Sequence, residues 1–336
     1  MRVGAIGYGT QMRSVLLPAL LTLPFGSVYG RVERSRACEL VGIATASRRS
    51  ASEAAADHHV PTHVGYADLI TRDDVDAVVV AVPPDQLAGV TVAALRAGKH
   101  VFCEAPGVRS SGEAAAVRRA VAAAKDRALM YGACTRYMPV YRKLRELLAR
   151  SRRADPTPRL VAIRYFVWSW FYYDLVRFLA GEVRAVSAWR LAEHEVAILE
   201  LASGDAAVVA ACPTDDPSVP LEAVDVTGGR TWLCARNGWD LASFARGGGR
   251  YELDAAGGSL WHPSSLPYGR LNPLYLRGYT AELAAFVRCV RTGAPSDSGL
   301  DDVAGTMRLV GAVRRSIASG RRVVIPAARH ARRPAR

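Results

Sequence analysis

A continuous apolar run near residue 80 constrains the fold of this chain most. Residues 74–84 read DVDAVVVAVPP, and no charged side chain interrupts positions 77–82. A strand that is apolar at every position must be covered on both faces, which is typical of parallel sheets. Because Pro83 and Pro84 stop the run, we predict that this strand ends at the carboxyl edge of a parallel sheet, with helices as crossovers.

The flanking sequence repeats the same alternation of strand and helix through residue 135. We expect strands at 3–6, 39–44, 74–84, 101–106 and 128–133. We expect helices at 12–21, 86–97 and 110–127. Such alternation is the signature of a doubly wound α/β domain, which we place at residues 1–135.

A charged, proline-containing stretch at 151–159 (SRRADPTPR) follows, and the pattern then changes. A strand at 160–167 and a helix at 168–180 precede five short alternating segments at 183–190, 196–201, 206–211, 221–227 and 231–235. Helices at 273–292 and 300–319 and a strand at 322–325 close the pattern. We therefore predict an α+β domain over residues 136–326, with an open and mostly antiparallel sheet, and a flexible basic tail at 327–336.

Composition excludes several classes of protein. The net charge is +13, but the arginines are spread over the whole chain and no nucleic-acid motif accompanies them, which argues against a nucleic-acid partner. No apolar run reaches about 18 residues, so we expect no membrane partner. The N-terminus has no secretory leader pattern, so we expect a cytoplasmic protein. The six cysteines form no C-x-x-C pair, and we expect free thiols and no metal.

Gly7-Tyr8-Gly9 follows the first strand and precedes a helix, which is the context that gives a G-x-G motif its meaning. Gly7 would permit a tight turn, and Gly9 would let the backbone approach a pyrophosphate at the helix N-terminus. The third glycine position of the fingerprint is Met12, which weakens the motif. The alternative is a strand–turn–helix without a ligand.

The end of the second strand bears on the choice of cofactor. In NAD-binding units an acidic residue there bonds the ribose 2′-hydroxyl, but this chain has Thr45, followed by Ala46-Ser47-Arg48-Arg49. Small hydroxyl groups beside arginines suit a 2′-phosphate, so we favour NADP over NAD. The alternative is that the arginines only cover a surface helix. The predicted cofactor-binding residues are Gly7, Gly9, Thr10, Gln11, Met12, Thr45, Ser47, Arg48, Val82, Pro83, Pro84, Glu104 and Ala105.

Several motifs together resemble one family. Gly7-Tyr8-Gly9, DVDAVVVAVPP, ALRAGKHVFCEAP and YGACTRYMPVYRKL occur in order, and Arg277-Gly278-Tyr279 through Glu282 resembles the closing segment of the same family. The chain thus resembles the glucose–fructose oxidoreductase/inositol dehydrogenase/MocA family of two-domain NAD(P)-dependent oxidoreductases. The resemblance implies hydride transfer between a nicotinamide and a small polar carbonyl or alcohol substrate, with a sugar-like metabolite as the default. It also implies a homo-oligomer that associates through the C-terminal sheet.

Three departures from the family pattern change the expected chemistry. The family usually has Glu-Lys-Pro at 104–106, where this chain has Ala105, and two frequent histidines correspond to Leu87 and Phe171. An acid/base group at the oxygen contributes roughly 10²–10⁴-fold to rate, so another group must supply the proton. By the resemblance, Glu104 lies near the nicotinamide ribose, and Pro106 fixes the turn, for which a cis bond is one form.

The candidate catalytic residues are Tyr131, Tyr172, Tyr173 and Asp174. Tyrosine, with a pKa near about 10, can act as an acid in a reduction. The alternative is that each is an aromatic or polar residue that packs at a domain junction. Two other functions remain open: an imine reductase in specialised metabolism, because the thiazolinyl imine reductase branch of the family also lacks the lysine, and a cofactor-binding member without redox turnover.

Overall fold

The computed structural model describes residues 1–23, 37–165, 170–212, 222–245, 258–263 and 273–326. The chain folds into two units, each with its own sheet. The first contains Met1–Pro139 and Ser264–Ala304, and the second contains Val140–Pro263 and Gly305–Arg336. The predicted tail at 327–336 lies outside the described residues.

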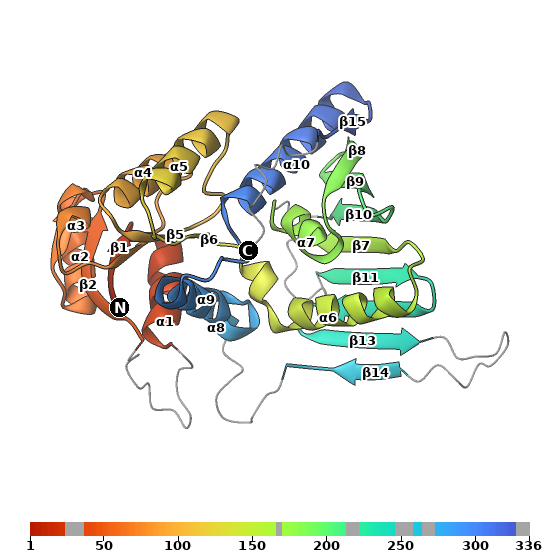
Figure 1. Ribbon diagram of the computed structural model, residues 1–336, viewed down its shortest axis with the longest axis horizontal. Coiled ribbons are helices and arrows are strands. Elements are labelled where there is room, and N and C mark those ends of the chain that lie inside the picture. Colours follow the sequence, from red (N-terminus) through yellow and green to blue (C-terminus); the bar gives the residue numbers. More distant parts are fainter. Residues whose placement is uncertain (24–36, 166–169, 213–221, 246–257, 264–272, 327–336) are drawn as a thin grey trace. The chain divides into compact units, whose positions relative to one another are not determined.

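The first unit is built on a six-stranded parallel sheet with the strand order β3-β2-β1-β4-β5-β6 (Figure 1). The order runs outward in opposite directions from β1 and β4, which is the doubly wound topology predicted from the sequence. The strands are β1 (Arg2–Ile6), β2 (Glu39–Thr45), β3 (Thr62–Val64), β4 (Ala77–Val80), β5 (His100–Cys103) and β6 (Leu129–Tyr131). The helices are α1 (Leu17–Leu21), α2 (Arg48–His58), α3 (Ala67–Thr71), α4 (Leu87–Arg96), α5 (Ser111–Ala123), α8 (Pro273–Leu276) and α9 (Tyr279–Thr292).

Helices cover both faces of this sheet, as the apolar run in β4 requires. On one face, α1 and α9 pack on the strands, and Met12, Leu16, Leu283 and Phe286 are among the buried side chains. On the other face lie α4 and α5, which pack against each other (Figure 1). All four residues of β4 are buried, which confirms that the strand is covered on both sides.

The first helix has an irregular start. The predicted helix at 12–21 consists of a π-helical turn over Met12–Leu16 followed by α1, with Pro18 in the first turn of α1. Proline is tolerated there because its missing N–H would have no partner within the helix. Met12 is fully buried at the start of the widened turn, so the turn accommodates a side chain that a third glycine would lack.

Some elements differ from their predicted extents. β4 ends at Val80, so residues 81–84 continue as irregular chain at the sheet edge. The predicted helix at 273–292 is two helices, because Gly278 adopts a φ of 84° between them. Glycine is needed at this position, since a Cβ would lie 2.2 Å from the carbonyl oxygen of Cys134. The segment 264–304, expected in the second domain, groups with the first unit.

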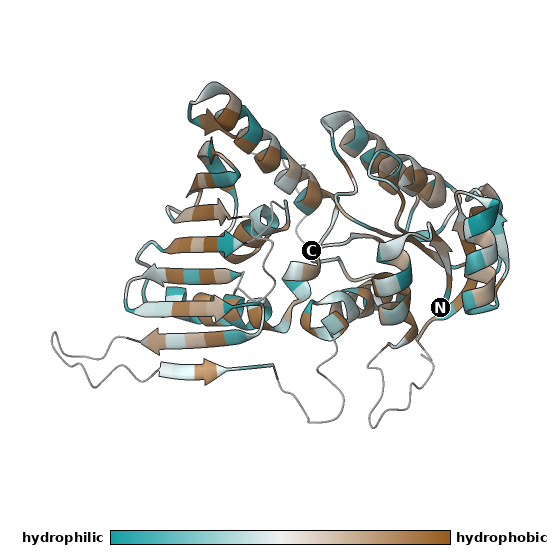
Figure 2. Ribbon diagram, turned by 180° about the vertical axis from the view of Figure 1, so that it is seen from behind, coloured by the Kyte–Doolittle hydropathy of each residue, from teal (hydrophilic) through white to brown (hydrophobic). Residues whose placement is uncertain are grey.

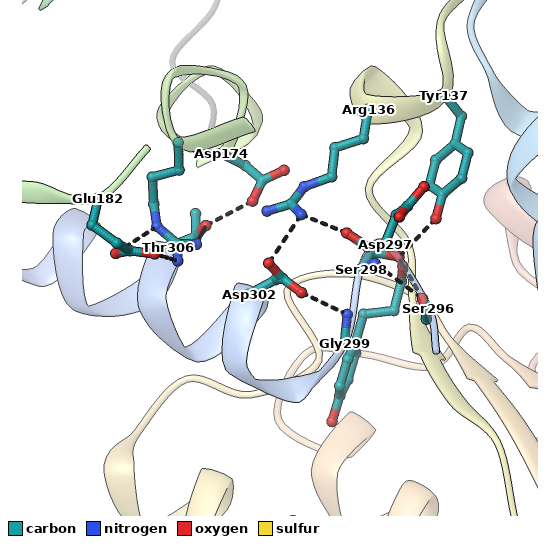
Figure 3. A network of polar contacts seen from close by, with 12 residues as sticks. Arg136, Tyr137, Asp174, Glu182, Ser296, Asp297, Ser298, Gly299, Asp302 and Thr306 are labelled. Atoms are coloured by element: carbon teal, nitrogen blue, oxygen red, sulfur yellow. Dashed lines mark hydrogen bonds and ion pairs between the residues drawn. The ribbon is translucent and has the colours of Figure 1, made fainter. Parts of the chain in front are cut away.

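Contacts after β6 show why the later segment returns to the first unit. The Tyr131 N–H donates to the Ser298 carbonyl (2.9 Å), and the Ser298 hydroxyl donates to the Tyr131 carbonyl (2.7 Å). Buried Arg136 donates to the Asp297 carbonyl (2.5 Å) and pairs with Asp302 (3.1 Å) (Figure 3). These are long-range interactions that no local sequence pattern predicts.

The second unit is built on a nine-stranded sheet with the order β14-β13-β12-β11-β7-β10-β9-β8-β15. Every pairing is antiparallel except that between β10 and β7, which confirms the mostly antiparallel prediction. The strands are β7 (Leu160–Tyr165), β8 (Val183–Leu191), β9 (His194–Leu201), β10 (Ala206–Ala211), β11 (Ala223–Gly228), β12 (Thr231–Arg236), β13 (Asp240–Ala245), β14 (Gly258–Trp261) and β15 (Val323–Val324). The helices are α6 (Pro139–Ala154), α7 (Trp170–Ala180) and α10 (Leu300–Ser319), of which α6 and α10 each begin in the first unit.

One face of this sheet is buried and the other carries exposed apolar residues. Tyr173 of α7 contacts β9 and Ser316 of α10 contacts β8 on the buried face. Figure 2 shows bands of hydrophobic residues that cross the strands. The large apolar side chains that are more than 40% exposed on these strands are Leu160, Trp189, Leu191, Ile198, Trp232, Leu260 and Val324. Among the described residues, no helix is long and apolar enough to cross a membrane.

Candidate functional site

Gly7 and Gly9 occupy the carboxyl end of β1, where the strand order reverses. Gly7 has a φ of 95°, and a Cβ at this position would lie 2.0 Å from the carbonyl oxygen of Ala81, which follows β4. Only glycine fits there without displacing the backbone. A Cβ on Gly9, in contrast, would meet no atom within 4 Å. The fold therefore requires glycine at position 7, whereas the absence of a side chain at Gly9 leaves unoccupied space at the sheet edge.

Tyr8, between the two glycines, fixes this turn to α2. Its hydroxyl donates to Asp57 Oδ2 at 2.6 Å, and its ring packs edge-on against His58. The Arg13 guanidinium lies over the ring, 5.1 Å from its centre, and pairs with Asp57 at 3.4 Å. Burial and the Asp57 carboxylate raise the pKa of Tyr8 to about 12. The tyrosine thus holds the glycine turn in place and stays protonated.

The end of β2 has the groups expected of a phosphate site. Thr45 is buried, and its hydroxyl donates to the Ser47 carbonyl at 2.9 Å. The Ser47 hydroxyl caps α2 by accepting from the Ser50 N–H at 3.2 Å. Arg48 is exposed and has no ion-pair partner among the described residues, whereas Arg49 pairs with Glu53 at 3.1 Å. The helix N-terminus and Arg48 can both attract an anion.

Val82, Pro83 and Pro84 follow β4 at the same edge. Val82 is half-buried and both prolines are exposed. The Pro83 carbonyl accepts from the Gln86 N–H at 2.9 Å, which starts the turn into α4. Parallel strands place their carboxyl ends on one edge, so these residues and the glycine turn lie along the same edge of the sheet.

Glu104 follows β5 and makes two hydrogen bonds. Its Oε1 accepts from Gln11 Nε2 at 2.5 Å, and its Oε2 accepts from the Ala105 N–H at 2.6 Å. Burial raises the pKa of this carboxyl group. Ala105 is half-buried, and the Ala105–Pro106 peptide bond is cis. A Cβ on Gly132 would lie 2.5 Å from Glu104 Oε2, so glycine makes room for the carboxylate.

Two further polar side chains join Glu104 and Gln11. The phenol of half-buried Tyr279, the first residue of α9, lies close enough to the side chains of Gln11 and Cys134 for both to influence its pKa. Burial raises the pKa of both the Tyr279 phenol and the Cys134 thiol. We call these four residues the edge cluster. Tyr279 and Cys134 were not among the predicted site residues, because they lie far from the glycine motif in the sequence and only the fold brings them to it.

The predicted residues on the first helix differ in what they can offer a ligand. Thr10 is exposed at the start of the helix, and Gln11 is half-buried in the edge cluster. The Met12 side chain is fully buried in the core, so it can contribute to a ligand only through its backbone.

Tyr131 ends β6 and lies inside the first unit. Its side chain is fully buried, and its hydroxyl has no hydrogen-bond partner among the residues that the structure describes. The ring packs against Gly107, where a Cβ would lie 2.1 Å from a ring carbon. Burial raises the pKa of this phenol, which weakens it as an acid. Its role as a proton donor therefore stays a prediction.

Tyr172, Tyr173 and Asp174 lie on α7 in the second unit, and each is buried there. The Tyr172 ring stacks on Tyr165 with ring centres 4.0 Å apart. The Tyr173 hydroxyl donates to Glu195 Oε1 at 2.8 Å, and burial raises its pKa. These residues also stay predictions for catalysis.

Asp174 belongs to a polar network between α7 and α10. Its Oδ1 accepts from the Thr306 hydroxyl at 2.7 Å, and Thr306 in turn accepts from Arg177 at 2.8 Å (Figure 3). Arg177 also pairs with Glu182 at 2.5 Å. A Cβ on Gly305 would lie 2.3 Å from the Arg177 guanidinium, so a larger residue there would have to displace that group from the network.

At the two positions where the resembled family frequently has histidines, this chain has apolar side chains. Leu87 is buried at the start of α4, and Phe171 packs on Trp170 with ring centres 4.2 Å apart. In the part of the chain that the structure describes, no three histidine, cysteine, aspartate or glutamate side chains are grouped to hold a metal ion.

Comparison with known proteins agrees with the geometry of the first unit. Residues 1–133 match the sequence profile described as "Oxidoreductase family, NAD-binding Rossmann fold". Over these residues the chain is thus similar to the glucose–fructose oxidoreductase/inositol dehydrogenase/MocA family.

Part of the chain is similar in sequence to the D-xylose 1-dehydrogenase (NADP(+)) of Hypocrea jecorina. It is 38% identical over 90 residues, which cover 26% of this chain and 22% of that protein. The chain thus matches about a fifth of the length of that relative.

Solved structures share the fold over nearly the whole chain. Levoglucosan dehydrogenase in complex with NADH and levoglucosan has a TM-score of 0.81 at 19% identity, covering 97% of this chain and 100% of that one. An oxidoreductase domain protein from Kribbella flavida also has a TM-score of 0.81, at 21% identity, covering 97% and 99%. At these identities the likeness concerns the fold alone, which these structures share with both units.

Proposed function

We propose that the protein is an NAD(P)-dependent oxidoreductase that transfers a hydride between the nicotinamide and a small polar carbonyl or alcohol substrate of the sugar class. The observation that carries the proposal is the unoccupied space beside the Gly9 backbone, where a Cβ would meet no atom within 4 Å. This space lies where the strand order reverses and near the polar edge cluster. A dinucleotide that crosses the carboxyl edge there would place its pyrophosphate at the helix N-terminus. The sugar dehydrogenases among the related proteins support the substrate class.

In this arrangement the cofactor, which supplies the hydride, would be held by the residues of one edge. Gly7, Gly9, Thr10 and Gln11 would contact the pyrophosphate, with Met12 contributing its backbone only. Along the rest of the edge, the residues that would border the cofactor are Thr45, Ser47, Arg48, Val82, Pro83, Pro84, Glu104 and Ala105.

NADP is the favoured form of the cofactor. Thr45 replaces the acidic residue that would repel a 2′-phosphate, and Arg48 has no ion-pair partner among the described residues. The NADP(+) named for the relative from Hypocrea jecorina supports this choice, while the NADH bound to levoglucosan dehydrogenase keeps NAD open.

The test of cofactor choice compares two adjacent arginines. We expect Arg48→Ala to weaken NADPH binding about tenfold, the effect of one charge-assisted hydrogen bond, and to leave NADH binding unchanged. Arg49→Ala is the matched control, because Arg49 already pairs with Glu53. Nicotinamide fluorescence on titration gives both affinities. Equal NADPH affinity in the two variants would count against a 2′-phosphate at Arg48.

We propose Tyr279 as a further candidate for the proton donor, besides Tyr131, Tyr172, Tyr173 and Asp174. It lies in the edge cluster with Glu104, whereas the hydroxyl of Tyr173 is already engaged by Glu195. The raised pKa keeps the Tyr279 phenol protonated, so it can donate a proton in carbonyl reduction but cannot act as a base in alcohol oxidation; as for Tyr131, the same shift weakens it as an acid, and its place in the edge cluster is what favours it.

The proton donor can be located by phenylalanine variants. With a substrate found on a panel of aldoses, keto-sugars and inositols, we expect Tyr279→Phe to lower kcat about 10²-fold or more and to leave NADPH affinity within about twofold. Tyr275→Phe, on the preceding helix α8, is the control. If Tyr173→Phe lowers kcat and Tyr279→Phe does not, the residue on α7 is the donor.

Ala105 motivates two other functions. The Glu-x-Pro turn has no lysine that could deliver a proton. An imine that arrives protonated needs less proton donation from the protein during reduction, and a non-redox role needs none. Turnover of cyclic imines but not sugars on the same panel would favour imine reduction. NADPH binding without turnover on either class would favour a cofactor-binding member without redox activity.

We also propose that the protein is a cytoplasmic homo-oligomer that associates through the exposed face of the second unit's sheet. Ile198, Trp232 and Leu260 expose apolar surface on that face, and such surface favours association. We expect sedimentation to show an oligomer that Trp232→Lys dissociates. A monomeric wild-type protein would exclude this interface.

A further inference from the structure

A cavity of about 490 Å³ opens at the amino edge of the parallel sheet in the first unit, at the opposite strand ends from Gly7 and Glu104. Its walls come from the residues that precede β1, β4, β5 and β6 and from the end of α9. Cavities of this size hold small metabolites. Its lining includes Asp73, Asp76, Lys99, His100, Arg127 and Arg291.

The hydrogen bonds of His100 fix where its proton lies. The backbone N–H of Ala128 donates to His100 Nδ1 at 3.0 Å, so Nδ1 is an acceptor and carries no hydrogen. A neutral imidazole must then carry its proton on Nε2. Burial and the nearby Arg127 lower the pKa of His100, so the neutral form is the one expected at neutral pH.

Arg127 adds a second donor at the same point. Its Nη1 lies 3.3 Å from His100 Nε2, and guanidinium nitrogens only donate. The two donors cannot satisfy each other, because Nε2 has no free lone pair in this tautomer. An oxygen of an anion that accepts from both would satisfy them together.

The charges around the cavity favour an anion, with one opposing group. Asp76 is engaged by Arg2 through two side-chain nitrogens, at 2.8 and 3.4 Å. Lys99 donates to two backbone carbonyls, which holds its charge beside the cavity. Arg127 and Arg291 add two further cations, while the Asp73 carboxylate opposes them.

We propose that this cavity is a second binding site, for a phosphate group, in which one phosphate oxygen accepts from both His100 Nε2 and Arg127. Phosphate suits the site because it offers several acceptor oxygens to donors that point to one spot. The cavity is larger than a free phosphate ion, so it has room for the organic part of a small phosphate ester. The site is independent of the proposed cofactor edge and of redox activity.

The test reads the site directly at His100. In protein labelled with ¹⁵N at histidine, long-range proton–nitrogen spectra are expected to show the Nε2–H tautomer of His100 in the free protein. On addition of inorganic phosphate, its Nε2 signal should shift saturably with a Kd of about 10 mM or below. An Nδ1–H tautomer, or no saturable shift, would overturn the proposal.

Charge-matched variants separate this site from general attraction to a basic protein. We expect Arg127→Gln to weaken phosphate binding about tenfold or more, whereas Arg119→Gln, on the exposed side of α5, should leave it unchanged. If Arg127→Gln does not fold, Arg291→Gln takes its place with the same expected direction. Equal binding in the arginine variant and the Arg119→Gln control would overturn the proposal.

Two ligands then distinguish the source of the phosphate. Glucose 6-phosphate that binds at least threefold more tightly than inorganic phosphate would identify a site for phosphate esters. Equal affinity would identify a site for the free ion. If unphosphorylated glucose shifts the His100 Nε2 signal with the same affinity as its phosphate, the assignment to phosphate is overturned.

Discussion

The two glycines of the first turn should respond in opposite ways to the same added methyl group. In Gly7→Ala, a residue with a Cβ must hold a φ of 95°, which costs about 1–2 kcal/mol. The methyl would also lie 2.0 Å from the Ala81 carbonyl oxygen, and relieving such an overlap costs about 1–3 kcal/mol. We expect Gly7→Ala to lose about 2–5 kcal/mol of stability, a fall in Tm of about 5–15 °C.

Gly9→Ala should leave the ligand-free protein as stable as the wild type. Its Cβ would meet no atom within 4 Å, and its φ is not in the left-handed range, so alanine fits and stability should stay within about 1 kcal/mol. The same methyl would occupy the space where a pyrophosphate approaches the backbone, so we expect NADPH affinity to fall about tenfold or more.

The assay combines thermal unfolding without ligand and NADPH titration by nicotinamide fluorescence. The expected pattern is a destabilised Gly7→Ala and a stable Gly9→Ala that binds the cofactor poorly. If Gly9→Ala binds NADPH as tightly as the wild type, no dinucleotide crosses this turn. If Gly7→Ala keeps the wild-type Tm, the strain argument is wrong.

Three further predictions concern single side chains. Burial raises the pKa of Glu104 in the folded protein, so the contribution of this group to stability is full below the unfolded pKa of about 4.3 and is lost as pH rises through the folded pKa. The Tm of Glu104→Gln should therefore increase relative to that of the wild type as pH rises above about 4.3. A Tm difference that does not change with pH would contradict this prediction. Gly107→Ala should lower stability by about 2–5 kcal/mol, measured by chemical denaturation, because its φ is 64° and its Cβ would overlap the Tyr131 ring; the double variant with Tyr131→Ala should recover part of the loss. Gly305→Ala should lower the Tm because its Cβ would displace the Arg177 guanidinium, whereas Gly311→Ala in the same helix should not, since its nearest neighbour lies 3.4 Å away.

The sequence by itself determined the first sheet, the type of the second and one edge of the candidate site. The apolar run at 77–82 can be buried only between two layers of helices, so it dictated a parallel sheet. Gly7, Thr45 and Glu104 were found because each directly follows or ends a strand, and parallel strands gather their carboxyl ends on one edge. These are consequences of local pattern and short spacing.

Only the tertiary structure decided which distant residues join that edge and which leave it. Tyr279 reaches Gln11 because the chain returns to the first unit after Ser264, through contacts such as that between Ser298 and Tyr131. Tyr173, an attractive acid by its neighbours in sequence, has its hydroxyl bonded to Glu195. The proton position of His100 likewise depends on a backbone N–H 28 residues away. Hydrogen-bond partners so far apart in the chain leave no periodic pattern, so folding alone brings them together.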